Sequence, residues 1–300
     1  MKHFLKLSDW STDEIFEALD LADKLKYERK HGIEHKLLRG MTLGMIFSKS
    51  STRTRVSFEV GIHDLGGTGL FLSSRDLQIG RGEPVEDTAR VLSRYLDGIM
   101  IRTYAQKEVE DLAKYGSIPI INGLTDYCHP CQVLADLMTI REHKGTLKGN
   151  KLCYIGDGNN MTNSLIVGGI KMGMTVSVAC PKGYTPDPDI MKWAEETGRF
   201  TWTENVLEAA KDADVLYTDV WASMGQEDEA AMRREIFKGY QINRDVMNVA
   251  AKDAMVLHCL PAHREEEITA EVFEEHAAEI FDEAENRLHA QKAVLVKCLA

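Results

Sequence analysis

Hydroxyl and guanidinium groups are concentrated in one short segment of the chain, residues 50–55. It reads Ser-Ser-Thr-Arg-Thr-Arg, follows the strand-like apolar run 43–47 and precedes a helical pattern. The start of a helix offers unpaired backbone N–H groups, and arginine offers a forked cation that fits phosphate oxygens. A capping cluster with solvated arginines is the plainer interpretation. The density of these groups at a strand-to-helix turn nevertheless favours an anion site.

A second group of residues could polarise a carbonyl. The segment 129–132 reads His-Pro-Cys-Gln, in which His129 can donate to a developing oxyanion and Gln132 can donate or accept. Arg102 ends another strand-like run, 98–101. Taken alone, a loop histidine is more often structural than catalytic, and a strand-end arginine is usually a surface charge.

The same region contains a Cys-x-x-Cys pair, Cys128 and Cys131. Such a pair could be a redox dithiol or half of a zinc site. The redox interpretation needs a thioredoxin-like unit, and none is apparent. The zinc interpretation needs further ligands, for which His258, Cys259 and His263 are the candidates. Both alternatives stay open at this point.

The segment 156–161, Gly-Asp-Gly-Asn-Asn-Met, follows a strand and opens a helix. Its glycine spacing approaches the dinucleotide fingerprint, but Met161 stands where the third glycine belongs. The next strand runs into Cys180 and Pro181, without the acidic residue that holds a ribose. A Rossmann-type nicotinamide enzyme is therefore the alternative from a different functional class.

Two later segments could hold an amine. Residues 219–226 follow a strand and begin with Asp219, and a strand-end carboxylate facing a cleft can bind an ammonium group. The plainer interpretation is a helix or turn cap. Residues 258–261 read His-Cys-Leu-Pro, although a buried cysteine such as Cys259 is usually an apolar filler.

Together these segments resemble the aspartate/ornithine carbamoyltransferase family, and most closely its ornithine-specific members. In family order, the matching motifs are Ser-Thr-Arg-Thr-Arg at 51–55, His-Pro-x-Gln at 129–132, Asp-Gly-Asn-Asn at 157–160, Asp-x-Trp-x-Ser-Met-Gly-Gln at 219–226, His-Cys-Leu-Pro at 258–261 and Glu-Asn-Arg at 285–287. Relatives that use putrescine or N-acylated ornithine replace the Ser-Met-Gly part. Ser48 departs from the pattern, which often has an acidic residue before the lysine, and this affects a local salt bridge rather than the phosphate contacts.

The resemblance implies transfer of a carbamoyl group from carbamoyl phosphate to the side-chain amine of L-ornithine, giving L-citrulline and phosphate. Another amine acceptor remains the alternative. The implied carbamoyl-phosphate contacts are Ser51, Thr52, Arg53, Thr54, Gln78, Arg102, His129, Pro130, Cys131, Gln132, Cys259, Leu260 and Arg287. The implied ornithine contacts are Asn160, Asp219, Ser223 and Met224, and the implied catalytic residues are Arg102, His129, Asp219 and Cys259. The resemblance also implies a cis Leu260–Pro261 peptide, whereas without it trans is favoured. It implies no metal and no organic cofactor.

The family also implies a homotrimer, or a multiple of trimers, with shared active sites. The polar segment 73–78 corresponds in order to a loop that reaches the neighbouring subunit's carbamoyl-phosphate site, where Gln78 would donate to phosphate. An ordinary surface loop is the plainer interpretation.

The elements that must position these residues alternate between strand and helix. Strand-like runs near 43–47, 98–101 and 118–121 precede a polar junction at 144–150, and four more follow it. This predicts an α/β fold of two doubly wound parallel-sheet domains with the active site in the cleft between them. The expected bounds are 1–143 for carbamoyl phosphate and 144–284 for ornithine, with the C-terminal helix 285–300 packing back on the first domain.

The composition is that of an ordinary globular protein. The 300 residues carry a net charge of −11, with 44% hydrophobic and 28% charged residues. Neither a nucleic-acid surface nor a membrane span is indicated, since cations are not in excess and no apolar run is long enough. Sparse cysteines and a start unlike a secretory signal predict a cytoplasmic location.

Overall fold

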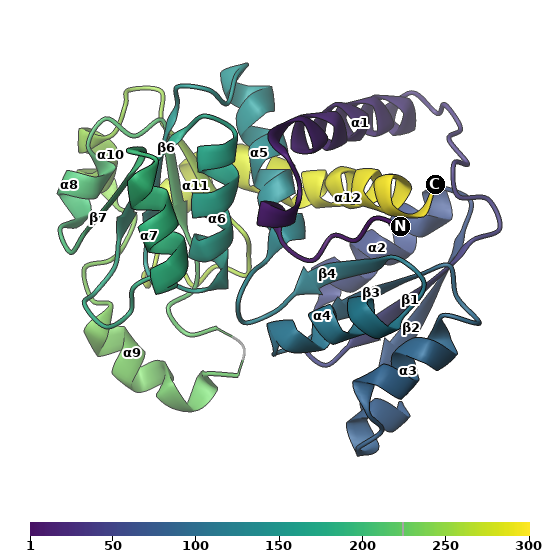
Figure 1. The fold of residues 1–300 in the computed structure, drawn as a ribbon. Coiled ribbons are helices and arrows are strands. Elements are labelled where there is room, and N and C mark those ends of the chain that lie inside the picture. Colours follow the sequence, from purple (N-terminus) through teal and green to yellow (C-terminus); the bar gives the residue numbers. More distant parts are fainter. Residues whose placement is uncertain (224) are drawn as a thin grey trace. The chain divides into compact units, whose positions relative to one another are not determined.

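The computed structural model describes residues 1–223 and 225–300, with only the backbone described at Gly80 and Glu227. The chain divides into two compact units, unit 1 (Met1–Ala135 with Asn286–Ala300) and unit 2 (Asp136–Glu285). Each unit is built on one parallel sheet with helices between the strands (Figure 1). The prediction of two parallel-sheet α/β domains is therefore confirmed.

Unit 1 holds a four-stranded sheet in the order β2-β1-β3-β4. Its elements are η1 (Leu7–Asp9), α1 (Thr12–Lys30), β1 (Thr42–Phe47), α2 (Thr52–Asp64), β2 (Thr68–Ser73), η2 (Gln78–Arg81), α3 (Val85–Leu92), β3 (Gly98–Arg102), α4 (Gln106–Tyr115), β4 (Ile120–Leu124), the start of α5 (Pro130–Lys144) and the end of α12 (Ala277–Leu299). Isoleucines of β1, β3 and β4 pack with residues of α3 and α4. In this unit α2 packs tightly on α12, because a side chain at Gly61 would meet Lys292 at 3.2 Å.

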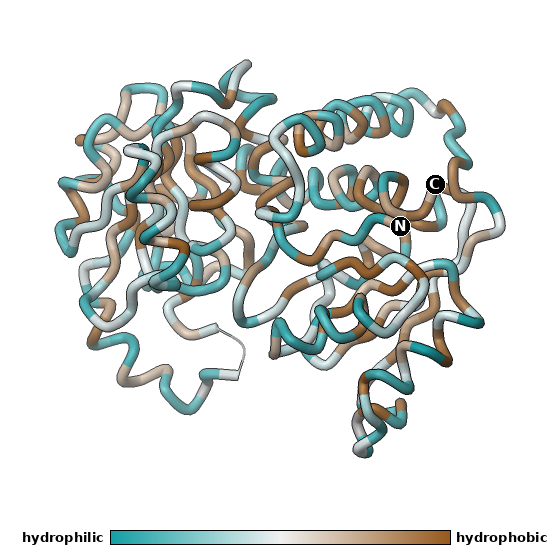
Figure 2. Tube along the Cα trace, viewed as in Figure 1, coloured by the Kyte–Doolittle hydropathy of each residue, from teal (hydrophilic) through white to brown (hydrophobic). Residues whose placement is uncertain are grey.

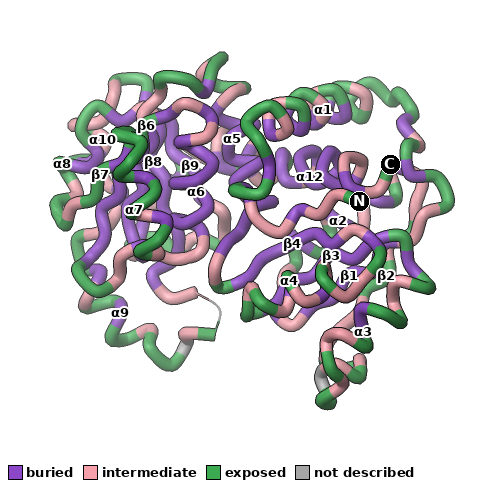
Figure 3. The backbone as a smooth tube through the Cα atoms, in the orientation of Figure 1, coloured by how far each residue is buried: buried purple, intermediate pink, exposed green. Residues whose placement is uncertain are grey.

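Unit 2 holds a five-stranded sheet in the order β7-β6-β5-β8-β9. Its further elements are β5 (Lys151–Ile155), α6 (Asn160–Lys171), β6 (Thr175–Ala179), α7 (Pro188–Glu196), β7 (Phe200–Thr203), α8 (Val206–Ala210), β8 (Val215–Thr218), η3 (Glu227–Glu229), α9 (Ala230–Ile236), α10 (Arg244–Val249), β9 (Met255–His258) and α11 (Ala270–Glu275). Residues of β5, β8 and β9 share one apolar core with α8, α10 and α11. The tubes in Figures 2 and 3 show these central strands as apolar and buried.

The strand orders place a topological switch point in each unit. In unit 1 the chain leaves β1 toward β2 on one side and returns to β3 on the other. In unit 2 the same reversal separates β5 from β8. Parallel α/β sheets bind ligands beyond the carboxyl ends of the strands at such points. Ligand-binding residues are therefore expected in the segments after β1, β3, β5 and β8.

Several elements differ from the sequence prediction. The last helix begins at Ala277 instead of Glu285, and the strand expected at 118–121 runs from Ile120 to Leu124. Helices α4, α8, α9 and α11 and strand β7 were not predicted. Helix α4 shows why, since Ala105 at its start provides no side-chain cap and its buried apolar residues are only Val109 and Leu112. None of the described helices is long and apolar enough to cross a membrane.

Candidate active site

Residues 50–55, the expected anion site, lie where β1 ends and α2 begins. Ser51 caps α2, and its hydroxyl accepts from the Thr54 N–H at 3.2 Å. Arg287 of α12 donates to the Thr54 hydroxyl at 2.8 Å, although the two residues are 233 positions apart. Two cations and a helix start therefore meet here, because Arg53 occupies the first turn of α2 and lies half-buried.

Lys49 supports the same loop from outside. Its buried ammonium group pairs with Asp126 and lies 4.4 Å from the centroid of the Tyr104 ring. Lys49 thus ties the segment after β1 to the loop after β4.

The residues expected to polarise a carbonyl, Arg102, His129 and Gln132, also lie in unit 1. Arg102 is only 3% exposed, and in the sheet it lies opposite Phe47, the last residue of β1. Burial, and then the charges of Arg287 and Arg102, hold the pKa of His129 well below its ordinary value. The imidazole is therefore neutral at pH 7 and can donate from one nitrogen to a carbonyl oxygen. Gln132 is fully buried nearby on α5.

Burial argues against a redox role for the Cys-x-x-Cys pair. It raises the pKa of both Cys128 and Cys131 to about 12, so the thiolate that a redox dithiol needs is strongly disfavoured. Cys131 donates to the Asn122 carbonyl at 3.3 Å and acts as a buried polar filler.

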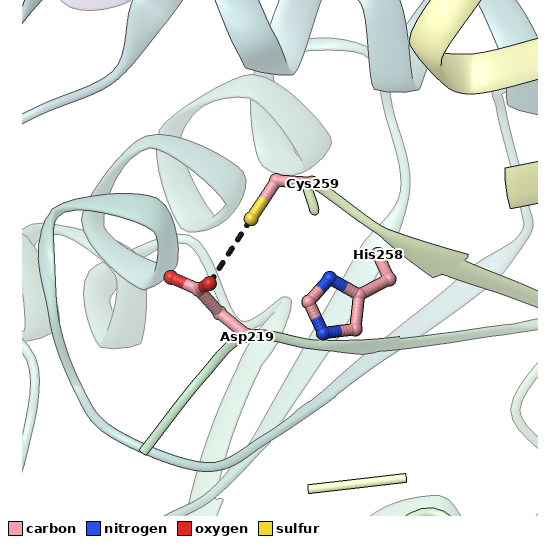
Figure 4. A group of neighbouring side chains, drawn as sticks. All are labelled: Asp219, His258 and Cys259. Atoms are coloured by element: carbon pink, nitrogen blue, oxygen red, sulfur yellow. Dashed lines mark hydrogen bonds between the residues drawn. The ribbon is translucent and has the colours of Figure 1, made fainter. Parts of the chain in front are cut away.

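The residues expected to hold the substrate amine, Asp219 and Cys259, lie at the switch point of unit 2. Asn159 caps α6, and its amide donates to Asp219 Oδ2 at 3.0 Å. The Cys259 thiol donates to Asp219 Oδ1 at 3.1 Å (Figure 4). Burial and the nearby Asp219 carboxylate raise the pKa of Cys259 well above its ordinary value, so Cys259 is a thiol donor and not a nucleophile. Asp219 is 7% exposed and lies next to two neutral donors.

The glycine turn after β5 leaves no room for a dinucleotide. The Gly158 N–H donates to the Tyr184 carbonyl at 2.8 Å, and a Cβ on Gly158 would lie 2.3 Å from the Pro186 nitrogen. In a dinucleotide site the backbone at this glycine approaches the pyrophosphate. Here residues 184–186 occupy that position, which rules against the nicotinamide alternative.

Both ring nitrogens of His258 make hydrogen bonds that fix the segment following β9. Its Nδ1 accepts from the Leu260 N–H at 2.9 Å, and its Nε2 lies 2.9 Å from Glu267. Nε2 therefore carries the proton. Asp219, His258 and Cys259 stand close enough to suggest a metal site, but in Figure 4 Cys259 faces Asp219, and both His258 nitrogens are already engaged. Leu260 precedes a cis peptide bond and has a φ of +57°, an uncommon conformation for a branched residue.

Comparisons with known proteins match the whole chain. Residues 2–142 match the carbamoyl-P binding domain of aspartate/ornithine carbamoyltransferases, and residues 148–298 match their Asp/Orn binding domain. The chain belongs to the aspartate/ornithine carbamoyltransferase family. The ornithine carbamoyltransferase of Oceanobacillus iheyensis is 56% identical, over 100% of this chain and 94% of its own length. That of Pyrococcus horikoshii is 55% identical, over 99% and 96%.

Solved structures of the family give the same result. The ornithine carbamoyltransferase of Pyrococcus furiosus superposes with a TM-score of 0.94 at 54% identity, covering 99% of this chain and 97% of that one. The anabolic enzyme of Campylobacter jejuni gives 0.92 at 44% identity, covering 98% of each chain.

Within this family framework, each unit gathers its own share of the predicted site residues. Unit 1 holds Ser51, Thr52, Arg53, Thr54, Arg102, His129, Pro130, Cys131, Gln132 and Arg287, and unit 2 holds Asn160, Asp219, Ser223, Cys259 and Leu260. Met224 lies outside the described residues, and Gln78 is exposed on η2.

The sequence analysis did not predict three charged residues that contact and orient the candidate site residues or their neighbours. Glu267 orients His258, and Glu283 accepts from Tyr217 at 3.1 Å and from the His258 N–H at 2.8 Å. Arg233 pairs with Asp157. No local pattern marks Glu267, Glu283 or Arg233, since each lies in a run of ordinary charged residues.

Proposed function

We propose that the chain transfers the carbamoyl group of carbamoyl phosphate to the side-chain amine of L-ornithine, giving L-citrulline and phosphate. The observation that carries this proposal is Asp219, a buried carboxylate at the switch point of unit 2, held by Asn159 and Cys259. Such a carboxylate favours an acceptor with an ammonium group. The relatives named ornithine carbamoyltransferase match essentially the full chain and support the same conclusion.

Unit 1 supplies the carbamoyl-phosphate site in this proposal. The α2 start, Ser51 to Thr54, and the guanidinium groups of Arg53 and Arg287 bind the phosphate and stabilise it as it leaves. Arg102 and the neutral His129 donate to the carbonyl oxygen as it gains charge. We infer the domains as 1–143 with residues 285–300, and 144–284. These bounds lie close to those of the two compact units, which change over at Ala135/Asp136 and Glu285/Asn286.

Unit 2 supplies the ornithine site. Asn160 and Ser223, with Met224, bind the amino-acid end, and Asp219 with Cys259 positions the substrate so that its amine meets the carbonyl carbon. The ornithine ammonium group first gives up one proton to solvent. The neutral amine then attacks, the bond from carbon to the phosphate oxygen breaks, and the departing phosphate takes up the second proton that the nitrogen loses. The Cys259 thiol forms no covalent intermediate, and holding both reactants in line lowers the entropic barrier. No metal ion or organic cofactor takes part in the proposed reaction.

Ornithine is expected to be the preferred acceptor. Aspartate would place its side-chain carboxylate against Asp219, and putrescine lacks the amino-acid end that Asn160 and Ser223 would bind. Purified enzyme assayed with carbamoyl phosphate and each of ornithine, aspartate, putrescine and N-acetylornithine measures this directly. A higher kcat/KM for any competitor than for ornithine would show that the acceptor assignment is wrong.

We also infer a homotrimer, or a multiple of trimers, located in the cytoplasm. Strand β2 is an edge strand, and Leu70 and Phe71 on it are 42% and 40% exposed. Val56 on α2 and Tyr95 after α3 are also exposed, at 51% and 75%. Natural proteins rarely leave an apolar edge strand uncovered, so a second copy of the chain is the expected occupant of this side of unit 1.

The shared site can be tested by complementation between subunits. In the proposed trimer, Gln78 reaches the neighbouring carbamoyl-phosphate site, because a head-to-tail ring gives each site one loop from next door. Gln78→Ala and Arg53→Ala are each expected to retain only a small fraction of wild-type activity alone. Under conditions of subunit exchange, their mixture should regain activity, because some sites receive both wild-type residues. Inactive hybrids after proven exchange, or an active isolated monomer, would contradict the shared site.

A further inference from the structure

A buried arginine, Arg233 on α9, lies in unit 2 beside the acceptor residues and has no role in the mechanism above. Its side chain is 7% exposed, whereas that of its neighbour Arg234 is 56% exposed. Burying a cation is costly unless it is paired and hydrogen-bonded. The position of Arg233 therefore needs a physical explanation that the exposed Arg234 does not.

The contacts of Arg233 join three segments of unit 2. Its Nη1 donates to Asp157 Oδ2 at 2.8 Å and to the Trp221 carbonyl at 3.0 Å. Its Nε donates to Glu229 at 3.0 Å. One guanidinium thus links the turn after β5, the segment after β8 and the start of α9.

Aromatic rings complete this arrangement. The guanidinium lies 5.2 Å from the centroid of the Tyr184 ring and 5.8 Å from that of Phe237. The Trp221 indole donates to the Tyr240 carbonyl at 3.1 Å. Trp221 stands two residues before Ser223, so these contacts fix where the acceptor-binding segment leaves the sheet.

The charges of the site also depend on Arg233. Asp157 and Asp219 are both 7% exposed and follow the two strands of the switch point. Burial raises the pKa of Asp157 to about 6, and the Arg233 guanidinium opposes that rise. Among the residues that the structure describes, Asp219 has neutral donors and no cation at ion-pair distance. Arg233 therefore neutralises one carboxylate and leaves the other to the substrate.

We propose that Arg233 is a positioning residue that sets the affinity and specificity for the acceptor. It fixes the segment that begins at Trp221 against the turn after β5, and it cancels the charge of Asp157, so that Asp219 alone attracts the ammonium group of the substrate. This proposal rests on the proposed function, because it takes ornithine as the acceptor. A purely structural role would instead affect both substrates alike.

The test compares Arg233→Gln, Arg233→Lys and the control Arg234→Gln in the full-length protein, with each substrate varied in turn. Arg233→Gln is expected to raise the KM for ornithine by about 10- to 100-fold, as the loss of charge-assisted hydrogen bonds does. The KM for carbamoyl phosphate should stay within about twofold of wild type. Arg233→Lys keeps the charge but not the planar fork, so its KM for ornithine should lie between those of wild type and Arg233→Gln. Arg234→Gln should behave as wild type.

A second variant separates charge from shape. Adding Asp157→Asn to Arg233→Gln removes the carboxylate left without its cation, and it should recover part of the lost ornithine affinity. An ornithine KM for folded Arg233→Gln within about threefold of wild type would overturn the proposal, as would equal rises in both KM values. If Arg233→Gln does not fold, Arg233→Lys takes its place: its KM must rise for ornithine and not for carbamoyl phosphate, and an equal effect on both substrates overturns the proposal. A wild-type protein that does not use ornithine would overturn the proposed function instead.

Discussion

Arg102→Ala and Arg53→Ala are each expected to lower kcat/KM by at least ~100-fold, because each removes a charge-assisted contact at the reacting centre. Arg102 is the clearer case, since its guanidinium is buried beside the end of β1. Charge developing on a substrate next to a desolvated cation is stabilised more strongly than it would be in water. Arg53, in the first turn of α2, adds its charge to that of the helix start.

The arginine variants have a clear control and a second measurement. Arg39→Ala removes an exposed arginine of the same unit and should leave kcat/KM unchanged. Arg102 is also one of the two charges that hold the pKa of His129 down. An NMR titration of Arg102→Ala should therefore show the His129 pKa moving upward. Wild-type kcat/KM in folded Arg53→Ala and Arg102→Ala would mean that carbamoyl phosphate does not bind at this edge of the sheet.

Asp219→Asn is expected to lower kcat/KM for ornithine by about 100-fold, mostly through a higher KM for ornithine. The substitution keeps the shape of the side chain but removes the charge that attracts an ammonium group. It also places an amide opposite the Asn159 amide, where Asp219 Oδ2 now accepts at 3.0 Å. Steady-state kinetics with each substrate varied in turn provides the measurement.

The control for Asp219→Asn is Asp189→Asn, which changes an exposed aspartate of α7 in the same unit. The control should match wild type in both KM values. Parallel losses for ornithine and carbamoyl phosphate in Asp219→Asn, or no loss at all, would remove Asp219 from the acceptor site.

Much of the arrangement of the candidate site could be predicted because its signals are local. Ser51 and Thr54 contact each other within one helical turn, as a hydroxyl-rich strand-to-helix junction predicts. Arg102 ends a strand of unit 1, and Asp219 directly follows a strand of unit 2. Within each parallel sheet the strands bring their carboxyl ends to one edge, where ligands bind. The alternation of apolar runs and helical patterns predicted two parallel sheets for the same reason, since periodicity is a property of neighbouring residues.

The strand order was decided only by the tertiary structure, and with it the partners of the site residues. Arg287 meets Thr54 across 233 positions, and Arg233 meets Asp157 across 76. Neither pair has a sequence pattern, because which side of a sheet a chain returns to depends on packing between whole helices and strands. Burial then set the chemistry, since the same imidazole and thiol groups in water would keep their ordinary pKa values. The sequence by itself determined which side chains stand at the strand ends, and the fold determined their partners and protonation, because desolvation and long-range contacts exist only once the chain is packed.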